Sequence, residues 1–167
     1  MLNYLTLYLF PAMLLLGAGY DVASFRIPNW IPAGLAAAFL PVAIMSGMSW
    51  GAIGLSVLAG IILLIAGMAL FAFKVLGGGD AKLLAAAALW IGMSDLLLYV
   101  CAVGIVGGLF AILLLTFRRV PMPATLAGQS WLMRLHSGKE GIPYGVALAA
   151  AGVLVFPQTV LYTSLTS

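Results

Sequence analysis

The chain has 167 residues, of which 65% are hydrophobic and only 7% are charged. Soluble domains carry roughly 25% charged residues, so this chain has too little charge to cover a surface that faces water. The composition therefore excludes a soluble enzyme and a nucleic-acid-binding domain, and it predicts an integral membrane protein. Its apolar runs are continuous and do not alternate, which favours transmembrane helices over a barrel.

Six apolar segments are candidates for membrane spans, since a spanning helix needs about 20 residues. We expect these spans at 2–20, 30–45, 51–73, 80–92, 95–117 and 144–162. The second and the fourth are short, and Pro41 predicts a kink or a tilt in the second. Before the last span, Trp131, Arg134 and His136 stand among apolar residues, a pattern that predicts a helix lying on the membrane surface.

The basic residues all fall within, or next to, alternate connections between these spans, and the other connections have none. They are Arg26, Lys74, Lys82, Arg118, Arg119, Arg134 and Lys139. The positive-inside rule then places these connections in the cytoplasm and both chain termini on the outer side. We therefore expect one all-α, multi-pass domain over residues 1–167 in the cytoplasmic (inner) membrane. Its single cysteine, Cys101, predicts neither a disulfide nor a zinc site.

Two of the four acidic residues, Asp21 and Asp80, are predicted at the cytoplasmic edge of a span. An acid at a membrane boundary is a candidate functional group. Two carboxylates that lie close together cannot both ionise readily, so they share a proton. One can then activate water while the other polarises a peptide carbonyl, and this hydrolysis needs no metal or cofactor. Asp95, predicted on the outer side, is interpreted as a cap of the fifth helix.

Three glycines precede the second of these acids, at positions Gly77, Gly78 and Gly79. Glycine has no Cβ, so it permits a positive φ and a close approach of another backbone. Taken alone, the three glycines indicate only a flexible turn between two spans. The adjoining Asp80 and the second acid, Asp21, favour a catalytic site where an extended peptide substrate can reach the carboxylates.

Three motifs resemble those of the type IV prepilin peptidases, which are GxGD aspartyl proteases of membranes. The first is Asp21 followed by Arg26-Ile27-Pro28-Asn29, and the second is Gly77-Gly78-Gly79-Asp80-Ala81-Lys82. The third is Gly141-Ile142-Pro143-Tyr144-Gly145. They occur in the family's order and in the three predicted cytoplasmic connections, so the resemblance extends over nearly the whole chain.

The resemblance implies a GxGD protease-like bundle of six helices that removes the short leader of a prepilin-like precursor at the cytoplasmic membrane face. Asp21 and Asp80 match the family's catalytic pair. The supporting or substrate-binding residues that the resemblance implies are Gly77, Gly78, Gly79, Lys82, Arg26, Pro143, Tyr144 and Gly145. The chain starts at its first span, so it looks like the short form that serves Flp or tight-adherence pili, and we do not predict N-methyltransferase activity.

Two alternative interpretations of the acids remain open at this point. Asp21 and Asp80 would form a proton relay if the protein were a small transporter or an ion-coupled carrier. A relay more naturally has its acids at the bilayer midplane with access from both sides, whereas both acids are predicted at one face. In the second alternative, Arg26 pairs with Asp21 and makes it a structural residue.

Overall fold

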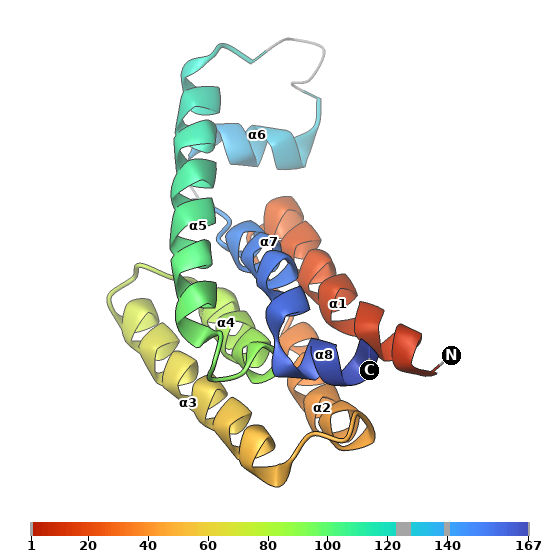
Figure 1. Cartoon of the computed structure of the whole chain (residues 1–167). Coiled ribbons are helices and arrows are strands. Elements are labelled where there is room, and N and C mark those ends of the chain that lie inside the picture. The colour runs from red at the N-terminus through yellow and green to blue at the C-terminus, as the bar shows by residue number, and fades with distance from the viewer. Residues whose placement is uncertain (1, 123–127, 139–140, 167) are drawn as a thin grey trace.

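The computed structural model describes residues 2–122, 128–138 and 141–166, and all regular secondary structure in these ranges is helical (Figure 1). Lys139, one of the basic residues used above to predict the topology, lies outside the described residues. The helices are α1 (Leu2–Ser24), α2 (Trp30–Met45), α3 (Trp50–Ala72), α4 (Gly78–Ile91), α5 (Leu96–Arg119), α6 (Ser130–Ser137), α7 (Gly145–Val155), the short 3₁₀ helix η1 (Phe156–Gln158) and α8 (Val160–Thr166).

Three of these helices are long and apolar enough to cross a membrane, by length and composition: the stretches Thr6–Ser24, Trp50–Ala72 and Leu96–Arg119. Large apolar side chains such as Ile65 and Leu113 remain exposed on α3 and α5. A lipid environment accounts for that exposure, since apolar surface of this extent is rare on soluble proteins. The helices α2 and α4 have 16 and 14 residues, fewer than a perpendicular span needs. The count of six spans and the outer location of both termini stay predictions.

The last expected span is not one helix. Its first part, α7, and its last part, α8, meet at an angle of 57°. Pro157 lies in the short helix η1 between them, and proline lacks the N–H and the space for its ring that a continuing helix requires. The Thr159 hydroxyl then accepts a hydrogen bond from the Tyr162 N–H at 3.2 Å, which caps the start of α8. The expectation of a continuous helix over 144–162 is therefore wrong at this point.

Helix α4 lies at the centre of the bundle and packs against α3, α2 and α7 (Figure 1). Small residues allow this: a Cβ on Gly60 of α3 would come within 2.6 Å of the Leu89 side chain. Near the C-terminal end of α4, the Trp90 ring stacks on Phe10 with 5.4 Å between ring centroids. The Trp90 indole N–H donates to the Leu35 carbonyl at 2.9 Å. The C-terminal end of α4 therefore lies within an aromatic cluster of the core.

Helix α6 lies across the C-terminal end of α5 (Figure 1). The Arg118 Nε–H donates to the Leu135 carbonyl at 2.9 Å, and a His136 ring nitrogen bonds to the Val120 carbonyl at 2.9 Å. The expected helix around Trp131 is confirmed, while its place on a membrane surface stays a prediction. Asp95 occupies the N-cap position of α5, but its side chain makes no capping bond and instead accepts the Ser94 hydroxyl at 2.9 Å.

Candidate active site

Both predicted catalytic carboxylates line one cleft of about 620 Å³. The cleft lies among the end of α1, the connection from α3 to α4 and the segment that precedes α7. The residues that line it are Asp21, Phe25, Phe71, Ala72, Lys74, Val75, Leu76, Gly77, Asp80, Gly141, Ile142 and Tyr144. In the described part of the chain, no three side chains of metal-binding type come together as a metal site.

Asp21 lies in the last turn of α1, and only 4% of its surface is exposed. Its Oδ2 accepts a hydrogen bond from the Gly145 backbone N–H at 2.7 Å. A Cβ on residue 145 would lie 2.8 Å from the same oxygen, so only glycine lets this N–H approach so closely. The preceding Pro143 is fully buried, and Tyr144 both occupies the N-cap position of α7 and lines the cleft. The third motif thus supplies a backbone donor that holds the first acid.

Asp80 lies in the first turn of α4 and is 8% exposed. Its carboxylate accepts a hydrogen bond from the Gly77 N–H, the N-cap residue of α4, and the helix dipole favours an acid in this turn. Its Oδ1, by contrast, is buried and has no hydrogen-bond partner in the described structure. Buried polar atoms are nearly always bonded, so an unpaired carboxylate oxygen in a cleft calls for an explanation such as a reactant.

The three glycines before Asp80 serve close packing. A Cβ on Gly78 would come within 3.3 Å of the Phe71 ring, and one on Gly79 within 3.1 Å of Ile27. None of the three glycines has a positive φ. The expectation that they serve to permit a positive φ is therefore wrong. Ile27 also lies 3.1 Å from the Cβ that Gly145 lacks. One buried side chain of the first motif therefore touches the second and the third.

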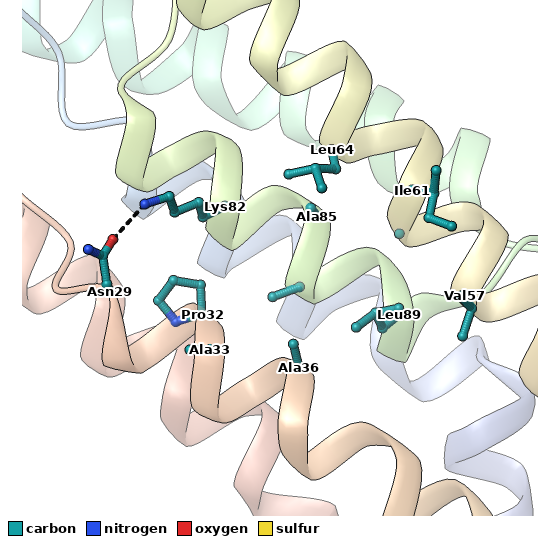
Figure 2. Close-up of a pocket in the computed structure, with 12 residues that line it drawn as sticks. Asn29, Pro32, Ala33, Ala36, Val57, Ile61, Leu64, Lys82, Ala85 and Leu89 are labelled. Atoms are coloured by element: carbon teal, nitrogen blue, oxygen red, sulfur yellow. Dashed lines mark hydrogen bonds between the residues drawn. The ribbon is translucent and has the colours of Figure 1, made fainter.

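Lys82 and Arg26 do not reach the cleft. Two residues along a helix correspond to a rotation of about 200°, so Lys82 leaves α4 on a different side from Asp80. Its Nζ donates to the Asn29 Oδ1 at 2.8 Å (Figure 2). Arg26 is exposed and lines a separate polar cavity together with Arg134. Among the described residues no ion pair joins Arg26 to Asp21, whose carboxylate is held by a backbone N–H.

Two residues that the sequence did not assign to the site have unusual backbone conformations and line this cleft. Phe25 and Lys74 have φ values of 52° and 58°, and they are the only described residues other than glycine with a positive φ. Lys74 terminates α3: its N–H bonds to the Phe71 carbonyl and the Val75 N–H to the Leu70 carbonyl, both at 2.9 Å. Glycine is the usual residue at this position of the motif. Strained backbone of this kind gathers at functional sites.

Arg118 is a further residue that the sequence did not assign to the site. Besides its bond to Leu135, its guanidinium donates to the carbonyl of Gly141, which lines the cleft. Gly141 has a φ of 87°, a conformation that favours glycine. The side chain thus ties the end of α5 to the edge of the cleft, four residues before the Gly145 donor. From the sequence alone, a basic residue in the last turn of a helix that contacts a site looks the same as one that only sets the membrane topology.

Comparison with known proteins yields one match. A family model described as the type IV leader peptidase family matches residues 8–112. This range covers well over half of the chain and includes both Asp21 and Asp80, whereas Arg118 and the third motif lie beyond its end. No curated protein and no solved structure matches the chain.

Proposed function

The chain belongs to the type IV leader peptidase family, and on this premise we propose that it is an aspartyl endopeptidase that removes the leader of prepilin-like precursors at the cytoplasmic membrane face. Family membership makes it a protease, and its apolar helices make it a membrane protein. The observation that carries the finer proposal is that Asp21 and Asp80, far apart in the chain, line one cleft and are both buried.

In the proposed reaction the two carboxylates share one proton, because two close acids do not both ionise readily. The ionised carboxylate takes a proton from water, and the water oxygen attacks the scissile carbonyl carbon. The protonated carboxylate donates a hydrogen bond to the carbonyl oxygen. The C–N bond then breaks, and the leaving amine takes up the proton. The Gly145 and Gly77 N–H groups orient the two acids, which leaves the unpaired Asp80 Oδ1 to face the reactants.

The proposed location follows from the connections that form the cleft. These include the residues after α1, the turn from α3 to α4 and the segment before α7, all of which are cytoplasmic in the predicted six-span topology. The protein would therefore be multi-pass in the cytoplasmic membrane, with a cleft open to substrate from the cytoplasm. The substrate enters in an extended form, because a helical peptide bond is already hydrogen-bonded and shielded.

The test is co-expression of a prepilin with the wild-type chain and with Asp21→Asn or Asp80→Asn, with the mature and precursor forms separated by gel mobility. Asparagine keeps the shape of each side chain and removes its ability to exchange a proton. We expect each variant to lose cleavage by about 10²–10⁴-fold, the usual contribution of a general acid or base. Asp95→Asn is the matched control, since this acid lies at the N-cap position of α5, accepts the Ser94 hydroxyl and does not line the cleft. Wild-type processing by either dyad variant would refute the proposal.

No observation favours the alternative of a transporter in which Asp21 and Asp80 relay protons. Both acids line a single cleft formed at the ends of helices, whereas a relay needs access from both sides of the membrane.

A further inference from the structure

A second hollow, here called the lateral groove, lies on the other side of α4 from Asp80. It has a volume of about 560 Å³, with α2 and α3 as its walls and α4 as its floor (Figure 2). Both walls pack on α4. Between Lys82 and Leu89, the floor consists of the small side chains of Ala85 and Ala86, so a space remains between the walls. The groove shares no lining residue with the cleft that holds the two acids.

The polar groups of the groove are gathered at one end. Figure 2 shows Asn29 and Lys82 together there, while Val57 and Leu89 lie toward the opposite end. The other lining residues are apolar or glycine. Lys82 is exposed, and the partner of its ammonium is the neutral Asn29 amide at 2.8 Å. No ion pair between this ammonium and any of the three described carboxylates is found, so its charge is available to an anion.

The groove opens on an apolar surface. On its α3 wall, 40% of the Val57 surface and 48% of the Ile61 surface are exposed. Helix α3 is one of the helices apolar enough to cross a membrane. In a bilayer, such side chains face lipid tails. The groove therefore presents an apolar channel along its length and a single cation at one end, next to the first turns of α2 and α4.

We propose that the lateral groove binds one anionic phospholipid, with an acyl chain lying along the Ala-floored channel and the headgroup phosphate at Lys82. Lys82 retains two N–H donors after its bond to Asn29, and the Asn29 amide NH₂ can also donate, so the pair offers several donors to phosphate oxygens. Basic residues in pockets between membrane helices on the cytoplasmic side are suited to acidic headgroups. A zwitterionic lipid would fill the channel equally well but would gain less from the unpaired charge.

The test measures lipid retained by the purified full-length protein in native mass spectrometry, after equal amounts of palmitoyl-oleoyl phosphatidylglycerol and the matching phosphatidylcholine are added. We expect the wild type to retain one phosphatidylglycerol in preference to phosphatidylcholine. Lys82→Gln should lower phosphatidylglycerol retention by about 5-fold, the effect of one basic residue on an anionic lipid. Lys82→Arg, which keeps the positive charge, should prefer phosphatidylglycerol as the wild type does. Arg119→Gln, which removes another exposed cation outside the groove, should leave it unchanged.

A second pair of variants tests the channel. Ala33→Phe fills the groove from the exposed face of α2 and should reduce retention of both lipids. Ala66→Phe adds the same ring at an exposed position of α3 outside the groove and should not. Equal phosphatidylglycerol retention by Lys82→Gln and wild type would overturn the proposal. Equal lipid retention by Ala33→Phe and Ala66→Phe would also overturn it. A change in the oligomeric state of Ala33→Phe with unaltered lipid retention would overturn it too, because that result would indicate a helix as the occupant of the groove.

Discussion

The two ends of helix α4 differ in whether their buried polar groups are hydrogen-bonded. At the C-terminal end, the Trp90 N–H bonds to Leu35 and the ring stacks on Phe10 within a dense aromatic cluster. At the N-terminal end, Asp80 is also buried, but its Oδ1 has no partner in the described structure. Satisfied buried groups stabilise a fold, whereas an unsatisfied one is tolerated where a reactant needs it. One helix thus joins an end where the buried polar group is satisfied to an end where a buried carboxylate oxygen is not, as the proposed catalytic role of Asp80 requires.

The two ends of α4 also differ in backbone conformation. Beyond the Trp90 end, the positive φ of 80° belongs to Gly92, which has no Cβ and adopts it without strain. Around the Asp80 end, Phe25 and Lys74 adopt positive φ values with full side chains. The cleft therefore has strained backbone where the packed core has none. This contrast can be tested by substitutions on each side.

The largest effect on stability is expected at the packed end. Trp90→Ala should lower the free energy of unfolding by about 3–5 kcal/mol, because the cavity cannot close in a dense core. Asp80→Asn should change it by less than about 1 kcal/mol, since it keeps an acceptor for the Gly77 N–H. Thermal unfolding in detergent measures both. Trp131→Ala, on the exposed side of α6, is the control for loss of an indole. A greater loss of stability in Asp80→Asn than in Trp90→Ala would reverse the comparison.

The next effect concerns the donor that holds Asp21. Gly145→Ala places a Cβ 2.8 Å from the Asp21 Oδ2, so the N–H and the carboxylate must move apart. We expect prepilin cleavage to fall by about 10²-fold, as displacements of this size do in active sites. Gly108→Ala is the matched control, because a Cβ there has no neighbour within 4 Å. If the two variants cleave equally well, the position of the Gly145 N–H does not matter for the reaction.

A smaller effect is expected from the guanidinium that ties α5 to the cleft edge. Lysine cannot bond to Leu135 and Gly141 with the planar fork that Arg118 uses, so Arg118→Lys should loosen this corner. We expect faster hydrogen exchange in Ser130–Ser137 and a loss of about 1 kcal/mol in local stability. Arg119→Lys changes the exposed neighbour and serves as the control. Unchanged exchange in Arg118→Lys would show that α6 is held by other contacts.

The smallest effect tests the strained backbone. At Lys74, where φ is 58°, glycine should be more stable than alanine by about 1 kcal/mol, because only alanine carries a Cβ into this conformation. At Lys82, inside α4, alanine should be more stable than glycine by about 1 kcal/mol, since glycine is the poorer helix former. Melting temperatures of the four variants give both differences. The same sign at the two positions would mean that the backbone at Lys74 is not strained.

Much of the fold follows from local patterns in the chain. The helix 30–45 begins and ends as expected, because its apolar run and flanking polar residues define it without tertiary information. The two acids and the glycine run before Asp80 also point to a site through residue type alone. Pro157 was a visible signal for the break between α7 and α8, although the apolar run across it suggested one helix. The catalytic roles of Asp21 and Asp80 stay predictions until the variants are assayed.

The sequence by itself determined that the chain forms apolar helices, where most of them lie, and which connections carry charge, because hydropathy and periodicity act over short stretches of chain. Only the tertiary structure decided which side chains meet. The linear motif groups Asp80 with Lys82, yet helix rotation and the packing of α2 and α3 on α4 place the first in the cleft and the second in the lateral groove. The Gly145 N–H reaches Asp21 across more than a hundred residues. Such contacts depend on how whole helices pack, and no local pattern records them.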